Sequence, residues 1–139
     1  MRPAFVVEGP IAMAWLFHDE ATRKTTALLN RLATGTALVP AWWFIERTTV
    51  LAMAERKGGR ISPAQSDAFI AHVSKLGIER DDEAPDRVFT HLLPLCRAHR
   101  LTSYDAIYLE LAIRQRLPLA TLDHHLRKTA KKLGVGLVG

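Results

Sequence analysis

The stretch Phe5-Val6-Val7-Glu8-Gly9-Pro10-Ile11 decides the fold that we expect for this chain. Its three leading apolar residues predict a short strand that is buried on both faces. An acid follows the strand directly, and Pro10 then suits the first turn of a helix. A strand that passes at once into a helix is typical of α/β proteins with a parallel sheet.

The same alternation of short apolar runs and amphipathic segments continues along the chain. Further strands are expected at 37–39, 78–79, 118–122 and 135–138. Helices are expected at 11–17, 20–33, 43–57, 63–76, 85–99, 103–116 and 123–133. Because short strands separated by helices imply crossover connections, we expect an α/β fold: a three-layer α/β/α sandwich with a central, mostly parallel sheet. We expect residues 1–139 to form a single domain.

Composition indicates a globular protein of the cytoplasm. The chain has 139 residues, of which 48% are hydrophobic, and this is enough for one sizeable core. The single cysteine, Cys96, has no partner for an internal disulfide, which favours a reducing compartment. No apolar run approaches the roughly 18 residues that a membrane span needs, so we expect no membrane partner.

The net charge of +5 is consistent with a polyanionic partner such as nucleic acid. Arg127, Lys128, Lys131 and Lys132 follow Asp123 on the last expected helix and are candidates for phosphate contacts. A solvated helix face, with cations favourably placed near the helix C-terminus, is the alternative.

Four carboxylates stand among apolar neighbours. Glu8 and Asp123 each follow an expected strand, and ligands of open parallel sheets bind beyond the carboxyl ends of strands. Glu46 and Asp105 share the apolar stripes of two expected helices. A carboxylate on a stripe that faces the core is costly unless it is paired or binds a metal ion. The four acids together suggest a shared cation.

A hard cation bound by these acids would explain why they stand among apolar residues. Mg²⁺ takes oxygen ligands, commonly one or two carboxylates with waters and a substrate phosphate. Such an ion can polarise a phosphodiester and activate a water for in-line attack. In the alternative interpretation Glu8 and Asp123 cap helices, Glu46 pairs with an arginine, and Asp105 contacts the first turn of its own helix.

Four segments carry a resemblance to a known family. They are 5–16, 38–40 with Glu46, 101–112, and 118–123 with Leu126, and the third, Leu101-Thr102-Ser103-Tyr104-Asp105-Ala106-Ile107-Tyr108-Leu109-Glu110-Leu111-Ala112, is the most specific. In these segments the chain resembles the PIN-domain family, and in their spacing the VapC-type toxins of toxin–antitoxin pairs. The resemblance runs nearly from end to end.

The resemblance implies a ribonuclease that depends on Mg²⁺ or Mn²⁺. It also implies a homodimer, an RNA substrate, and inhibition by a small antitoxin protein that reaches into the site. By position, Glu8, Glu46, Asp105 and Asp123 correspond to the catalytic, metal-binding acids of the family, and Thr121 to a polar neighbour of the site.

Three positions depart from the family pattern. Glu8 stands where the family usually has aspartate, Pro10 where it has a small polar residue, and Thr49 where it often has asparagine. The longer Glu8 side chain shifts its carboxylate, and a misplacement of about 1 Å can cost about 100-fold in rate. A catalytically weak or silent PIN-like domain that binds RNA or a partner protein is therefore the alternative hypothesis. A metal-dependent phosphatase or DNase using the same carboxylates is a third.

Overall fold

The computed structural model describes residues 2–56, 58–82 and 88–139. Its sheet has four strands, β1 (Phe5–Val7), β2 (Ala37–Pro40), β3 (Ile78–Asp81) and β4 (Leu119–Ala120). They lie in the order β3-β2-β1-β4, and all three pairings are parallel. The predicted parallel sheet is confirmed, with β3 as the expected edge strand.

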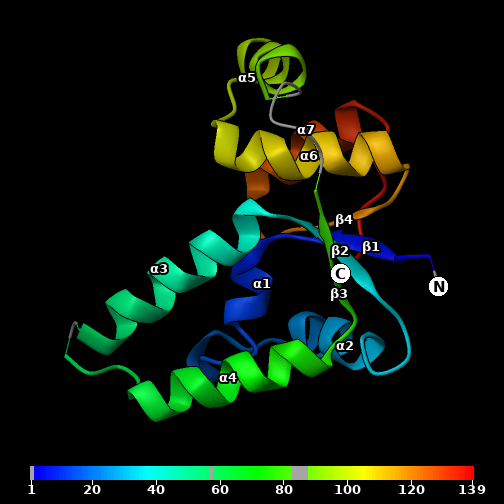
Figure 1. Cartoon of the computed structure of the whole chain (residues 1–139). Coiled ribbons are helices and arrows are strands. Elements are labelled where there is room, and N and C mark those ends of the chain that lie inside the picture. Colours follow the sequence, from blue (N-terminus) through cyan, green and yellow to red (C-terminus); the bar gives the residue numbers. More distant parts are fainter. Residues whose placement is uncertain (1, 57, 83–87) are drawn as a thin grey trace.

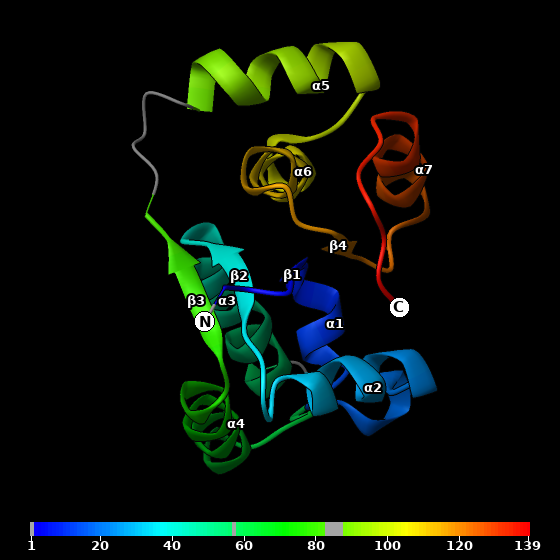
Figure 2. The ribbon, with the colours of Figure 1, turned by 90° about the vertical axis from the view of Figure 1, so that its right-hand side faces the viewer.

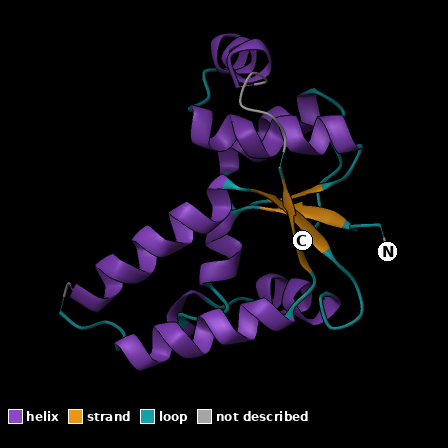
Figure 3. Cartoon of the chain, in the orientation of Figure 1, coloured by secondary structure: helices purple, strands orange, loops and turns teal. Residues whose placement is uncertain are grey.

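Helices cover both faces of this sheet, as Figure 1 and Figure 2 show. The helices are α1 (Gly9–Met13), α2 (Arg23–Arg31), α3 (Trp42–Arg56), α4 (Pro63–Lys75), α5 (Leu93–His99), α6 (Ser103–Gln115) and α7 (His124–Lys132). One face carries α6 and α7, with α5 outside α6, and the other carries α1 to α4. The predicted three-layer α/β/α sandwich is confirmed (Figure 3).

Burial explains why β1 is entirely apolar. Every residue of β1 is fully buried, because α6 lies on one face of the sheet and α1 to α3 on the other. A second, smaller cluster formed by Met13, Phe17, Leu51, Ile61 and Phe69 joins α3 and α4 where these two helices extend away from the sheet (Figure 1).

Side-chain caps set where several helices begin. The Ser62 hydroxyl accepts a hydrogen bond from the backbone of Gln65 at 3.1 Å, and the Gln65 side chain accepts one from the Ser62 backbone at 2.8 Å, as the sequence predicts. The helix predicted from residue 20 begins later, at Arg23, because Thr22 and Thr25 form a capping box there. A 3₁₀ turn, His18–Glu20, precedes it.

Two predicted strands differ in the structure. The run 118–122 pairs only at Leu119–Ala120, because the Thr121 hydroxyl accepts a hydrogen bond from the Asp123 backbone and turns the chain. The predicted strand 135–138 is wrong: it forms an isolated parallel bridge from Leu137 to Leu119. Because β4 is only two residues long, it offers residues 135–138 too short a strand for continuous pairing.

Two predicted helices also differ from the structure. The first ends at Met13 instead of residue 17, and tight turns follow it. Of the predicted helix 85–99, residues 85–87 lie outside the described residues. Lys57, the last residue of the predicted helix 43–57, also lies outside them. The described part begins as a π-helix, Val88–Leu92, and continues as α5. Within the described ranges, no helix is long and apolar enough to cross a membrane.

Candidate active site

Glu8 and Thr121 meet at the carboxyl edge of the sheet because β1 and β4 are neighbours. The Glu8 backbone donates a hydrogen bond to the Ala120 carbonyl at 2.9 Å, which extends the pairing by one residue. The Thr121 hydroxyl donates to Oε1 of Glu8 at 2.5 Å and accepts from the Asp123 backbone at 3.1 Å. Thr121 therefore links the first and the last of the four predicted acids.

The two acids at strand ends behave differently as helix caps. Asp123 caps α7, since its Oδ1 accepts a hydrogen bond from the Leu126 backbone at 2.7 Å. Glu8 occupies the capping position of α1 but makes no capping hydrogen bond with its side chain. Its carboxylate is 5% exposed and turned to Thr121 instead. The capping interpretation thus accounts for Asp123 and not for Glu8.

Asp105 lies in the first turn of α6, where it acts on Glu8. Burial raises the pKa of Glu8 to about 7, against the lowering effect of the hydrogen bond from Thr121. A hydrogen bond with Asp105, together with the negative charges of Asp105 and Asp123, adds to the rise in this pKa. Three of the four predicted acids therefore share one electrostatic environment.

The fourth acid, Glu46, is held by a tyrosine of another helix. Oη of Tyr108, on α6, donates a hydrogen bond to Oε1 of Glu46 at 2.6 Å. Burial and the neighbouring Glu46 raise the pKa of Tyr108, which keeps the phenol protonated as a donor. Sequence reasoning placed Tyr108 only on the apolar stripe of Asp105. Its polar tip, three residues beyond Asp105, was the available indication that it serves the site.

Arg47 is a component of the site that the sequence did not predict. Its side chain is 7% exposed, and its Nε and Nη1 have no hydrogen-bond partner among the described residues. The guanidinium lies against Gly9, where a Cβ atom would stand 1.9 Å from Nη1. Burial lowers the pKa of Arg47, and the charges of Glu46 and Glu8 oppose that effect. A buried positive charge therefore stands beside the acids.

The acids suit a hard cation with few protein ligands. Among the described residues, no three His, Cys, Asp or Glu side chains are gathered closely enough to hold a metal ion. Mg²⁺, however, commonly takes only one or two carboxylates and completes its shell with water and substrate phosphate. Glu8 and Asp105 are the candidates for such a pair, because Asp105 is among the neighbours that raise the pKa of Glu8. Binding of a cation by all four acids stays a prediction.

The predicted phosphate contacts on α7 fall into two classes. Nη1 of Arg127 donates to the Thr121 carbonyl at 3.0 Å, so this half-buried side chain supports the loop that carries Thr121. Lys128 and Lys131 are exposed on the same helix. Their contact with RNA stays a prediction.

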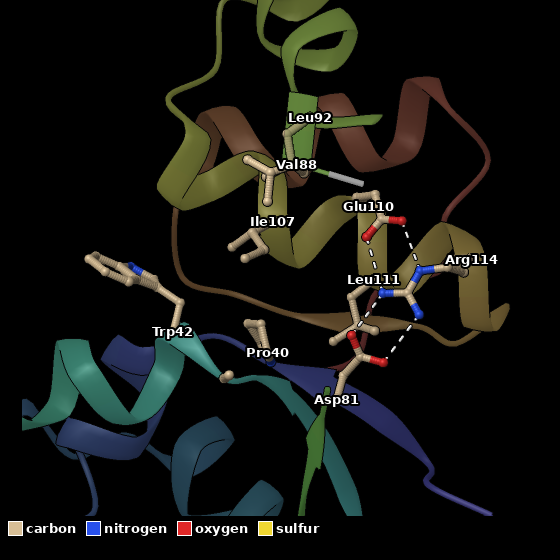
Figure 4. Close-up of a pocket in the computed structure, with 10 residues that line it drawn as sticks. Pro40, Trp42, Asp81, Val88, Leu92, Ile107, Glu110, Leu111 and Arg114 are labelled. Carbon is tan, nitrogen blue, oxygen red and sulfur yellow. Dashed lines mark hydrogen bonds and ion pairs between the residues drawn. The ribbon is translucent and has the colours of Figure 1, made fainter. Parts of the chain in front are cut away.

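A separate cavity of about 100 Å³ lies at the side of β2, between α3 and α6 (Figure 4). Arg114 closes one side of it and joins α6 to β3. Its Nε donates to Glu110 at 2.8 Å, and its Nη1 and Nη2 donate to the two oxygens of Asp81 at 3.1 and 2.9 Å. The hydrogen bonds to Asp81 and Glu110 raise the pKa of Arg114. This ion-pair network fixes the edge strand, and its recorded contacts among the described residues include none of the four acids.

Comparison with known proteins agrees with this architecture. Residues 6–132 match the family model of the PIN domain. No curated protein matches the chain.

Several solved structures share the fold at low sequence identity. A chain of the VapBC2 structure from Rickettsia felis, bound to a DNA fragment from its promoter, has a TM-score of 0.67 and 12% identity, with 96% of each chain covered. A chain of FitAcB from Neisseria gonorrhoeae has a TM-score of 0.63 and 13% sequence identity, with 97% of each chain covered. A chain of a toxin–antitoxin complex from Klebsiella pneumoniae has a TM-score of 0.61 and 16% sequence identity. The match covers 86% of this chain and 87% of that one.

Proposed function

Since this chain belongs to the PIN domain family, we propose that it is a divalent-metal-dependent endoribonuclease that hydrolyses RNA phosphodiester bonds. The observation that carries the proposal is the enclosed Glu8 at the carboxyl edge of the sheet, where Thr121 holds its carboxylate and Asp105 and Asp123 raise its pKa. Two carboxyl groups that share a buried environment repel each other when both are ionised, and a divalent cation relieves this repulsion. The cation would be Mg²⁺ or Mn²⁺.

Each residue of the site has a role in this proposal. Glu8 and Asp105 would hold the cation, and the Thr121 hydroxyl fixes the orientation of Glu8. When bound, the cation supplies Lewis acidity toward a phosphodiester and toward a water. Asp123 adds negative charge to the site. Glu46, oriented by Tyr108, would contact the cation through water or position the attacking water.

The structural neighbours support a partner for this chain. They include VapBC2 and a toxin–antitoxin complex, and we propose that this chain is likewise a cytoplasmic toxin inhibited by a small antitoxin. We further propose that residues 1–139 act as one domain and form a homodimer. Exposed Lys128 and Lys131 of α7 would contact RNA phosphates, together with Arg127.

A silent PIN-like domain that binds RNA or a partner protein is the second candidate. Two observations favour it: Glu8 is a glutamate tightly enclosed beside Thr121, and Arg47 already places a positive charge near the acids. This candidate predicts RNA binding or complex formation without turnover at any metal concentration.

The decisive experiment measures cleavage of a mixed RNA pool by purified protein, freed of any co-purified antitoxin, in Mg²⁺, Mn²⁺ or chelator. We expect cleavage with metal, none with chelator, and loss of at least about 100-fold in Asp105→Asn. Lys75→Gln, which changes an exposed charge on α4 outside the proposed RNA contacts, serves as the control with an intact acid site.

Three outcomes separate the hypotheses. Cleavage that persists in chelator contradicts the metal-dependent mechanism. Absence of cleavage by folded protein, with RNA still bound, favours the silent domain, and Glu8→Asp then tests whether the shorter acid restores activity. Single-stranded DNA and a small phosphate ester, assayed beside RNA, separate a ribonuclease from a DNase or a phosphatase.

A further inference from the structure

We propose that Arg47 is a built-in counter-cation of the acid site, which weakens the binding of divalent metal ions by Glu8 and Asp105. The proposal rests on the metal site assigned above and adds a residue that regulates its affinity. Arg47 would thereby raise the fraction of protein that is free of metal at a given metal concentration.

The position of Arg47 is set by the contact between α1 and α3. Its guanidinium lies against the backbone of Gly9, the residue after Glu8, at the place that the side chain of any other residue would occupy. It also lies 5.7 Å from the ring of Trp43, one turn earlier on α3. The guanidinium is therefore enclosed next to Glu8 and follows Glu46 directly in the chain.

The enclosed guanidinium lacks the partners that buried cations normally have. Its Nε and Nη1 are buried without a hydrogen-bond partner, and no ion pair with a carboxylate is found among the described residues. A buried charge is costly unless it is paired or lies in a compensating field. The charges that compensate here are those of Glu46 and Glu8.

Burial also decides how Arg47 acts on the site. Because Nε and Nη1 have almost no solvent access, an RNA phosphate cannot reach these two donors while α1 and α3 stay packed together. The charge of Arg47, in contrast, acts through space, and such interactions are strong where water is excluded. Through these two buried nitrogens Arg47 therefore acts on the acids by its charge and not by contact with substrate.

Arg47 and a metal ion then compete for the same negative charge. Without metal, the guanidinium offsets part of the repulsion within the acid cluster. When a divalent ion binds, the guanidinium repels it, so removal of the guanidinium charge should tighten metal binding. A lysine at this position keeps the charge only while it stays protonated, and burial favours the neutral amine, so its metal affinity should lie between those of the unmodified protein and a neutral variant.

The test is Mn²⁺ binding by the full chain, measured by isothermal titration calorimetry and by electron paramagnetic resonance of free Mn²⁺. We expect Arg47→Met to lower the Kd for Mn²⁺ about tenfold or more, which corresponds to about 1.4 kcal/mol. Arg47→Lys should give a Kd between those of the unmodified protein and Arg47→Met. Arg56→Met, which removes an exposed charge from the other end of the same helix, is the matched control and should change little.

The outcomes distinguish this proposal from the function on which it rests. If Asp105→Asn leaves Mn²⁺ binding unchanged, the metal site itself is wrong. If Asp105→Asn weakens binding but Arg47→Met does not tighten it, the role of Arg47 is overturned and the metal site stands. Should Arg47→Met fail to fold, Arg47→Gln supplies a neutral variant that retains hydrogen-bonding groups, and the same expectation applies.

Discussion

Two arginines enclosed in this protein have opposite surroundings. Arg114, between β3 and α6, donates to both oxygens of Asp81 and to Glu110, and these three side chains are 11% to 16% exposed. Arg47, between α1 and α3, is just as enclosed, yet two of its nitrogens have no partner among the described residues. Both side chains carry the same chemical group at similar depth, so only their neighbours distinguish them.

The difference separates a residue that supports the fold from one that belongs to the site. Arg114 joins an edge strand to a helix and is fully engaged in doing so. In the described part of the chain Nε and Nη1 of Arg47 make no hydrogen bond, and the acids that oppose the effect of its burial, Glu46 and Glu8, are ones that we assign to metal binding. An enclosed cation with partners is thus informative about stability, and an enclosed cation without them is informative about function.

The largest effect on stability is expected when Arg114, the arginine with carboxylate partners, is replaced. Arg114→Met leaves Asp81 and Glu110 mostly enclosed without their cation, and we expect a loss of about 3 kcal/mol in the free energy of unfolding. Urea denaturation monitored by circular dichroism measures it. Arg56→Met, an exposed arginine, should lose less than about 0.5 kcal/mol. A loss below about 1 kcal/mol in Arg114→Met would contradict the structural role of the network.

The second effect is a pH dependence of stability that comes from Glu8. The pKa of Glu8 is raised from its usual 4.5 to about 7, so the folded state disfavours its ionised form. Stability of metal-free protein should therefore be fully present below about pH 4.5, fall as pH rises toward about 7, and then level off, with a total loss of about 3 kcal/mol.

The pH dependence of Glu8 is isolated by a neutral variant. Glu8→Gln should lack this decline, and the difference between the two urea-denaturation profiles in chelator removes the contribution of other titrating groups. Parallel profiles for the two proteins would contradict the enclosed, raised-pKa assignment of Glu8.

The third effect tests the contact between Gly9 and Arg47 directly. Gly9→Ala places a methyl group where the guanidinium lies, and we expect it to cost about 1 to 2 kcal/mol of stability. In an Arg47→Met background the flexible thioether side chain should accept the methyl group, and the cost should fall below about 0.5 kcal/mol. In an Arg114→Met background it should remain unchanged, because that arginine lies elsewhere.

The smallest effect is expected for the unpaired arginine itself. Burial lowers the pKa of Arg47 more than the acids raise it, so the folded state gains when this charge is removed. We expect Arg47→Met to raise the stability of metal-free protein by about 1 kcal/mol, opposite in sign to Arg114→Met. Thermal unfolding in chelator makes the comparison. A loss as large as that of Arg114→Met would mean that the two arginines are equivalent after all.

Local sequence patterns predicted much of the fold because the governing interactions are local. The Ser62 capping box, the Asp123 cap and the buried strand Phe5–Val7 each depend on residues that are adjacent in the chain. The strand expected at 135–138 failed for the opposite reason. Its pairing depends on how many residues of β4 are available, and Thr121 ends β4 early by a hydrogen bond that its own strand pattern does not reveal.

The candidate site divides in the same way. The sequence placed Glu8 and Thr121 at the ends of neighbouring parallel strands, and the structure joins them by a hydrogen bond. The contact between Glu46 and Tyr108 spans 62 residues of sequence, and no periodicity within either helix indicates it. Metal binding by these acids stays a prediction that the proposed experiments address.

By itself the sequence determined the α/β class, the order of most elements and the positions of the four acids. These follow from the period of the apolar pattern and from the geometry of strand ends, which act over a few residues. Only the tertiary structure decided which charges are partnered. It gave Arg114 two carboxylates and left Arg47 enclosed against Gly9, because side-chain burial and distance through space depend on how distant helices pack.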